Sequence, residues 1–241
     1  MATVTQAPRD VLTDRQLVGL DDGHVAAAGG GVRLQPAAAC AFERLREDAR
    51  RAGFELAAAS TFRDFRRQLA IWDGKVAGRR PVHDDRGQPV ALARLSPGQR
   101  VHAVWRFSAL PGTSRHHWGT DLDVYDAVAL APGETPALTP AEGAPGGIFG
   151  PLHRWLDERI AAGASHGFFR PYARDRGGVA PERWHLSYAP LALALAPRLT
   201  PELLRRAWDE AGRPALAGDL EAELPALLAR YHGTAEGAGQ A

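Results

Sequence analysis

The amino-acid sequence predicts an α+β fold built as a single domain over residues 1–241. Two observations indicate this class. Short segments in which polar and apolar residues alternate, as in half-buried strands, are interspersed with longer segments whose apolar residues recur at helical spacing. No internal repeat and no stretch with the composition of an interdomain linker divides the chain. We expect the helices to lie mostly on one side of the strands.

The composition is typical of a soluble domain with a sizeable core, since 45% of the residues are hydrophobic and 24% are charged. The 29 basic and 28 acidic residues leave a net charge of +1, which gives no reason to expect a nucleic acid or an anionic membrane as partner. The N-terminus lacks the basic start and apolar run of a secretory signal. No segment reaches the ~20 apolar residues of a membrane span, so a cytoplasmic protein without membrane insertion is the default expectation.

The first half of the chain predicts helices separated by one strand. Residues 1–35 are expected to be irregular, with a flexible turn at the three glycines 29–31. Pro36 suits the opening turn of a helix that should stop at Gly53. The elements expected next are a buried strand at 54–59, a helix from about Asp64, an exposed loop at 79–95 and a short helix capped by Ser96.

The single cysteine, Cys40, excludes an intramolecular disulfide and a zinc site built from cysteines. It lies within the alanine-rich pattern of the first helix. We therefore expect a small buried apolar side chain there rather than a nucleophile.

The second half of the chain predicts two alternating strands, at 122–126 and 183–188. The elements expected around them are a surface excursion at 127–147, a helix at 151–162, a short strand at 168–169 and a charged loop at 174–181. Two helices close the chain. The first is capped at Thr200, and the second opens at Asp219 and is expected to kink near Pro225.

Two motifs carry side chains suited to a metal site. The first supplies His116 and Asp123, and the second, about sixty residues later, supplies Glu182 and His185. Gly119 can provide the turn that lets the first two side chains reach one point, although on a straight strand they would face opposite ways. Two imidazoles and a carboxylate can hold one zinc ion and leave an open position for water. Glu182 lies close enough to accept a proton from that water and to return it to a leaving amine.

The pattern Ser-x-His-x-x-Gly-x-x-x-Asp, followed by Glu-x-Trp-His, resembles that of the VanY/VanX-type D-alanyl-D-alanine carboxypeptidases. These enzymes group with the lysostaphin and hedgehog-like zinc peptidases. The resemblance covers about residues 37–190, which leaves an irregular N-terminal segment and a C-terminal helical extension around the core. It implies a small antiparallel sheet flanked by helices, one zinc ion, and hydrolysis of the terminal bond of peptidoglycan-type peptides that end in D-alanine.

The resemblance also implies a role for each matching position. Three residues are implied to be the zinc ligands: His116, Asp123 and His185. Glu182 is implied to be the catalytic base, and Arg63 is implied to face the scissile carbonyl and its developing oxyanion. Gln68 matches a position that contacts substrate, and Ser114 matches a serine that helps to bind the terminal carboxylate of the peptide.

Three residues depart from the family pattern. Asp121 stands where the family usually has a small residue, and on a strand it would share a face with Asp123. It could therefore compete for the metal or repel the carboxylate of the substrate. Arg183 replaces a proline, which could alter the strand or add a substrate contact. His117 is an additional histidine beside a ligand, and a structural role is expected for it.

Two other functions remain open at this point. An L,D-carboxypeptidase or a peptidoglycan endopeptidase would use the same metal chemistry, and the closure of the cleft around a terminal carboxylate would discriminate between them. A metal-containing recognition module without turnover is the alternative from another class. Glu182 and Arg63 argue against such a module, because a pure binder needs neither. A peptidoglycan substrate would also allow a location in the periplasm or cell envelope.

Overall fold

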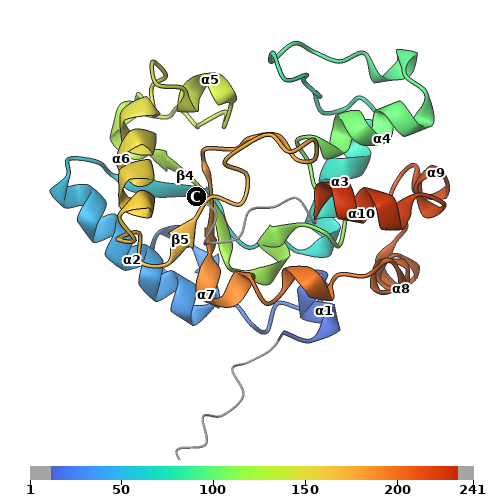
Figure 1. Cartoon of the computed structure of the whole chain (residues 1–241), viewed down its shortest axis with the longest axis horizontal. Coiled ribbons are helices and arrows are strands. Elements are labelled where there is room, and N and C mark those ends of the chain that lie inside the picture. The colour runs from blue at the N-terminus through green and yellow to red at the C-terminus, as the bar shows by residue number, and fades with distance from the viewer. Residues whose placement is uncertain (1–11, 233–241) are drawn as a thin grey trace, which may run out of the picture.

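The computed structural model describes residues 12–232 as short strands and helices (Figure 1). The strands are β1 (Ala26–Ala27), β2 (Arg33–Leu34), β3 (Leu56–Ser60), β4 (Asp121–Asp126), β5 (Phe168–Phe169) and β6 (His185–Tyr188). The helices are α1 (Asp14–Leu17), α2 (Pro36–Arg51), α3 (Phe65–Val76), α4 (Pro97–Trp105), α5 (Pro140–Gly143), α6 (Gly150–Ala161), α7 (Ala189–Ala192), α8 (Pro201–Ala211), α9 (Ala217–Glu221) and α10 (Leu224–Tyr231). Within these described residues, no helix is long and apolar enough to span a membrane.

Four strands form one antiparallel sheet in the spatial order β3-β4-β6-β5. The register places Asp123 of β4 directly beside His185 of β6 and, on its other side, beside Ser60 of β3. The pairing between β3 and β4 shifts between Ala58 and Ser60, where β3 ends. Segments that are remote along the chain therefore meet as neighbours across one sheet. The predicted α+β class, with a small antiparallel sheet flanked by helices, is confirmed.

The two faces of this sheet differ in polarity, because successive side chains of a strand point to opposite faces. Leu122 and Val124 of β4 pack with Leu186 of β6 in an apolar core that includes residues of α2 and α6. Asp123 and His185 occupy the alternate positions of the same strands and point to the other face. The apolar face thus anchors the sheet, and the polar face carries the residues singled out in the sequence.

A second core lies among α1, α3, α4 and the C-terminal helices α8, α9 and α10. Its fully buried tryptophans are Trp72, Trp105, Trp118 and Trp208. Figure 1 shows these helices on one side of the central strands, and α2 and α6 on the opposite side. The expectation that helices lie mostly on one side of the strands is therefore wrong. Since α2 and α6 already cover the apolar face of the sheet, the remaining amphipathic helices pack against one another.

The prediction that residues 1–35 are irregular is wrong where α1, β1 and β2 form and holds for residues 18–25, while residues 1–11 lie outside the described part. Helix α1 begins with a capping box in which Thr13 and Gln16 each accept the backbone N–H of the other. Strands β1 and β2 pair across the glycine turn at 29–31. The Thr-x-x-Gln pattern was a readable signal for α1, whereas two-residue strands are too short to show alternation.

Two further expectations are corrected by the structure. Cys40 is exposed rather than buried, because the inward face of α2 is formed by Ala38, Phe42 and Leu45 and Cys40 projects away from it. The closing helix is not kinked near Pro225 but divided into α9 and α10. Pro225 lies in the first turn of α10, where its missing N–H has no helical partner to lose.

Candidate metal centre

Gly119 shapes the first motif. It follows a 3₁₀ turn at Arg115–Trp118 and has φ of +64°, in the left-handed region that favours glycine. A Cβ atom there would lie 2.3 Å from Val25 Cγ1 and 3.2 Å from the backbone nitrogen of Gln35. The predicted turn at Gly119 is thus required by both conformation and space. It lets His116, before the turn, and Asp123, after it, face the same point.

The structure brings His116, Asp123 and His185 together. Their nearest ligand atoms all lie within 4.8 Å of one another, and all three side chains are buried. His116 Nε2 is 3.3 Å from Asp123 Oδ2, and His185 Nδ1 is 3.2 Å from Asp123 Oδ1. A group of two imidazoles and one carboxylate at this separation can hold a single metal ion.

In each histidine, one ring nitrogen is engaged in a hydrogen bond, which leaves the other nitrogen to face the candidate metal position. His116 Nδ1 lies 2.9 Å from the carbonyl oxygen of Thr61 and donates to it. His185 Nε2 lies 2.9 Å from Asp121 Oδ1 and donates to that carboxylate. The free nitrogens are therefore His116 Nε2 and His185 Nδ1, and both face Asp123. Metal-ligating histidines are normally oriented in this way by a partner on the other nitrogen.

The polar groups of the site fit a metal ion. Asp123 Oδ1 is buried and has no hydrogen-bond partner among the described residues, which is costly unless another ligand satisfies it. Burial opposes the ionisation of Asp123, but the two histidines hold its pKa well below the usual range. Burial also opposes the protonation of His185, yet Asp121 and Asp123 raise its pKa to about 9. A metal ion binding here competes with that proton.

Asp121 is fully buried and supports the site from behind His185. Besides the imidazole N–H, its carboxylate accepts hydrogen bonds from Arg115 Nε at 2.8 Å and from Thr120 Oγ1 at 2.5 Å. Arg115 is itself buried and donates to Ser187 Oγ at 2.6 Å. The pKa of Asp121 is lowered because Arg115 and His185 outweigh the effect of burial. Its oxygens are thus engaged in orienting His185 rather than directed at the metal position.

Replacing Asp121 with asparagine is expected to weaken zinc binding about 10–100-fold, the range typical of groups that orient a metal ligand. The amide keeps the size of the side chain but lacks the charge that stabilises the N–H of His185. Zinc affinity would be measured by competition with a chromogenic chelator. Asp126→Asn is the matched control, because Asp126 is buried on the same strand and accepts only backbone N–H groups away from the site. Equal affinities for the two variants would contradict this role.

Glu182 lies beside the ligands without joining them. Its Oε2 is 3.6 Å from His185 Nδ1, and its backbone carbonyl accepts the N–H of His185 in a tight turn. Burial raises the pKa of Glu182 to about 7, and the negative charge of Asp123 adds to this effect. His185, Lys75 and Arg63 act in the opposite direction. A carboxyl group with a pKa near neutrality can both accept and return a proton.

Arg63 follows β3 and is held in place by two hydrogen bonds. One terminal nitrogen donates to Gln68 Oε1 at 2.7 Å and the other donates to Ser60 Oγ at 3.0 Å, while its Nε is buried and has no hydrogen-bond partner within residues 12–232. Burial lowers the pKa of Arg63, against the attraction of Asp123 and Glu182. The predicted substrate contact, Gln68, is fully buried and also donates to the carbonyl of Ala109 at 2.6 Å. Gln68 therefore positions Arg63.

Ser114 and the two remaining unusual residues also have defined places. Ser114 is buried at the start of the 3₁₀ turn that carries His116. His117 donates from Nδ1 to the carbonyl of Arg63 at 2.6 Å and accepts at Nε2 from Gly112. Burial lowers its pKa to about 3, so it is a neutral structural link, as expected.

Arg183 turns away from the metal position. It donates to the carbonyl of Gly143 at 2.7 Å and pairs with Asp157 of α6. It therefore ties the segment before β6 to α5 and α6.

Tyr172 and Arg115 also contribute to the site and were not singled out in the sequence. The ring of Tyr172 packs edge-on against His185, with 5.2 Å between the ring centroids, and its carbonyl accepts the N–H of Glu182. Arg115 holds Asp121, as described above. Tyr172 lies in an irregular segment without a motif, so no local pattern indicated it. For Arg115 the sequence offered one signal. It lies next to the candidate ligand His116 and six residues before Asp121, a charged residue that departs from the family pattern.

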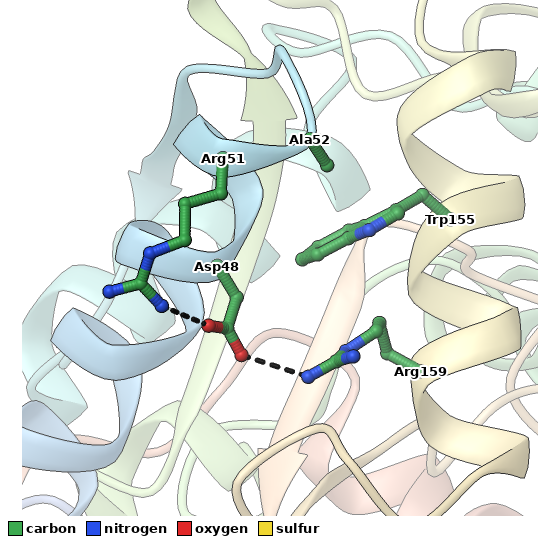
Figure 2. A pocket seen from close by; sticks show the side chains of 5 residues that line it. All are labelled: Asp48, Arg51, Ala52, Trp155 and Arg159. Atoms are coloured by element: carbon green, nitrogen blue, oxygen red, sulfur yellow. Dashed lines mark hydrogen bonds and ion pairs between the residues drawn. The ribbon is translucent and has the colours of Figure 1, made fainter.

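A separate pocket of about 280 Å³ lies between α2 and α6 (Figure 2). It is lined by Asp48, Arg51, Ala52, Trp155 and Arg159. Asp48 accepts hydrogen bonds from Arg51 and Arg159, each at 2.9 Å. The pocket contains none of the residues singled out for chemistry. Its one carboxylate, Asp48, is already paired with Arg51 and Arg159.

Comparison with known proteins finds one matching family and similar sequences. Residues 31–191 match the VanY family, described as D-alanyl-D-alanine carboxypeptidase. An uncharacterised protein of Haemophilus influenzae is 47% identical over 77 residues, which are 32% of this chain and 53% of that protein. The chain thus spans about half the length of this curated relative.

Two solved structures are also similar. A mutant of the vancomycin-resistance D,D-pentapeptidase VanY in complex with Zn(II) is 26% identical, with a TM-score of 0.48 and coverage of 68% of this chain and 77% of that one. VanYB in complex with D-alanine-D-alanine is 22% identical, with a TM-score of 0.50 and coverage of 84% and 91%. The family match includes both motifs of the candidate metal centre and extends over more than half of the sequence. The chain belongs to the VanY D-alanyl-D-alanine carboxypeptidase family.

Proposed function

We propose that this chain is a zinc-dependent D,D-carboxypeptidase that hydrolyses the terminal peptide bond of peptidoglycan-type peptides ending in D-alanine. The observation that carries the proposal is the convergence of His116 Nε2, His185 Nδ1 and Asp123, with Glu182 Oε2 3.6 Å from His185 Nδ1. Membership of the VanY family makes the chain a peptidase. The D-alanine-D-alanine bound to VanYB, which shares the fold, supports the substrate class.

The donor set supports zinc as the metal. Two neutral imidazole nitrogens and one carboxylate are a common three-ligand set for catalytic zinc, and they leave a position open. A zinc ion held there supplies a Lewis acid for the scissile carbonyl and lowers the pKa of a water molecule. The remaining chemistry has to come from the side chains around it.

Glu182 is the proton carrier in this proposal. Its carboxylate accepts a proton from the attacking water and delivers it to the nitrogen of the departing D-amino acid. Because burial raises its pKa to about 7, the cost of moving the proton in either direction is small near neutral pH. Its placement beside His185 keeps it within reach of the reacting centre without occupying a ligand position.

Arg63 stabilises the negative charge that develops on the carbonyl oxygen. Gln68 and Ser60 hold the guanidinium in a fixed orientation, so little reorganisation is needed when the charge appears. Gln68 is in turn fixed by the carbonyl of Ala109. Asp123 and Glu182 are among the charges that act on Arg63, which supports its assignment to the same centre.

The direct test is the bond that the zinc-loaded protein cuts. A muramyl pentapeptide ending in D-Ala-D-Ala, the corresponding tetrapeptide and a cross-linked muropeptide dimer would be compared by mass spectrometry. We expect release of one D-alanine from the pentapeptide. Cleavage confined to the tetrapeptide would replace the proposal with an L,D-carboxypeptidase, and cleavage confined to the cross-link would replace it with an endopeptidase. No cleavage of any of the three would contradict the proposal.

A further inference from the structure

Lys75 is the only lysine of the chain, since the other 28 of the 29 basic residues are arginine. It lies in the last turn of α3. A lysine ammonium is a compact point charge with freely rotating donors, whereas a guanidinium is a rigid planar fork. Lys75 therefore offers a ligand a different kind of cation from the arginines of the chain.

The register of α3 directs Lys75 to the candidate site. Gln68, which holds Arg63, lies seven residues before Lys75, so both side chains project from the same face of the helix. Two helical turns separate them, or ~10 Å along the axis. Lys75 is half-buried, and Glu182 and Arg63 are among the charged groups that act on its ammonium. Lys75 in turn acts to lower the pKa of Glu182.

Several cations of low exposure have a carboxylate partner, whereas Lys75 and Arg63 have none within residues 12–232. Arg106 pairs with Asp85 and Asp175, and Arg115 pairs with Asp121. Within residues 12–232, no ion pair engages the ammonium of Lys75; Glu182 acts on it from a distance. Burial lowers the pKa of Lys75, because a partly desolvated charge without a partner is unfavourable. An anionic group of a ligand would relieve this cost.

We propose that Lys75 binds the C-terminal carboxylate of the peptide substrate and thereby makes the enzyme an exopeptidase. This inference rests on the proposed function. A carboxypeptidase has to recognise a free carboxylate close to the bond that it cuts. The guanidinium of Arg63 is already held by Gln68 and Ser60 and is assigned to the reacting carbonyl in the proposed function, and Ser114 carries no charge. Lys75 projects from the Gln68 face of α3, and Glu182 is among the charges that act on it.

The test compares two substrates that differ only at the C-terminus, a D-Ala-D-Ala peptide acid and its amide. In the zinc-loaded full-length protein, Lys75→Met should reduce the acid-to-amide ratio of kcat/KM about 10–100-fold, the value of one hydrogen bond to a charged group. Lys75→Arg should recover part of this ratio. Arg80→Met is the matched control, because Arg80 also acts on Lys75 but packs along Gly74, and it should leave the ratio unchanged. An equal fall of both rates in Lys75→Met would overturn the assignment.

A binding measurement separates this proposal from the proposed function. Calorimetry on the zinc-loaded Glu182→Gln protein would compare the same acid and amide, with lysine or methionine at position 75. We expect the acid to bind at least about 10-fold more tightly, and Lys75→Met to remove the difference. Tight binding of the acid by Glu182→Gln, together with no cleavage of either peptide by the zinc-loaded protein that retains Glu182, would retain Lys75 and reject the hydrolase. Equal or undetectable binding of the two peptides would reject the role of Lys75.

Discussion

Replacing Glu182 with glutamine is expected to lower kcat/KM for a peptide ending in D-Ala-D-Ala by about 10²–10⁴-fold, the range attributed to general acid–base catalysis. The amide has nearly the same size but cannot carry the proton from water to the leaving amine. Zinc content should not change, because Glu182 lies beside His185 and is not one of the three converging ligands. The variant therefore separates metal binding from turnover.

The measurement combines steady-state release of D-alanine with metal analysis of the same preparation. Glu43→Gln, on the exposed side of α2, is the matched control for the loss of one carboxylate and should behave like the unaltered protein. Full activity in Glu182→Gln would show that another group carries the proton. Loss of zinc together with activity would show that Glu182 is a ligand.

Replacing Asp123 with asparagine is expected to remove both zinc and activity. Asp123 lies 3.3 Å from His116 Nε2 and 3.2 Å from His185 Nδ1, so its carboxylate is placed between the two imidazoles. The neutral amide is a poor zinc ligand, and it also removes the charge that balances the metal. The affinity loss should exceed the ~10–100-fold expected for residues that only orient a ligand.

Chelator competition, followed by reconstitution of the metal-depleted protein, would measure this effect. Asp126→Asn again serves as the control on the same strand. Circular dichroism would establish that both variants are folded, because Asp123 is buried and forms part of the sheet. Zinc binding by Asp123→Asn at unaltered affinity would show that the carboxylate is not a ligand.

The grouping of the residues at the candidate metal centre was largely predictable because they belong to two compact motifs. Gly119 indicated a turn, and that turn allows His116 and Asp123 to converge. The register of β4 against β6, which sets Asp123 beside His185, could not be derived from either segment alone. It depends on how the apolar residues between them, such as Leu122 and Leu186, pack on α2 and α6.

The supporting residues were less predictable, since their roles depend on contacts between remote segments. The sequence left open whether Asp121 competes for the metal or repels the substrate, and in the structure a buried arginine and Nε2 of His185 engage its carboxylate. Gln68 was expected at the substrate, and the structure shows it fully buried and hydrogen-bonded to Arg63, a contact that its spacing did not indicate. Sequence spacing shows which residues share a face, but it does not show which partner occupies the space opposite.

The fold departs from expectation where local patterns were short or equivocal. Helix α1 has only four residues, and β1 and β2 have two each, so their periodicity is not visible. Pro225 is compatible with either a kink within a helix or the first turn of a new helix. In the structure α9 and α10 pack as separate helices in the second core, and Pro225 lies in the first turn of α10.

The most direct test of the central claim is the anomalous difference signal at the zinc absorption edge in crystals of the zinc-loaded protein. We predict a single peak bound by His116 Nε2, His185 Nδ1 and Asp123, at about 2.0–2.2 Å from each ligand atom. A peak elsewhere, or a centre in which Asp121 replaces Asp123, would contradict the account.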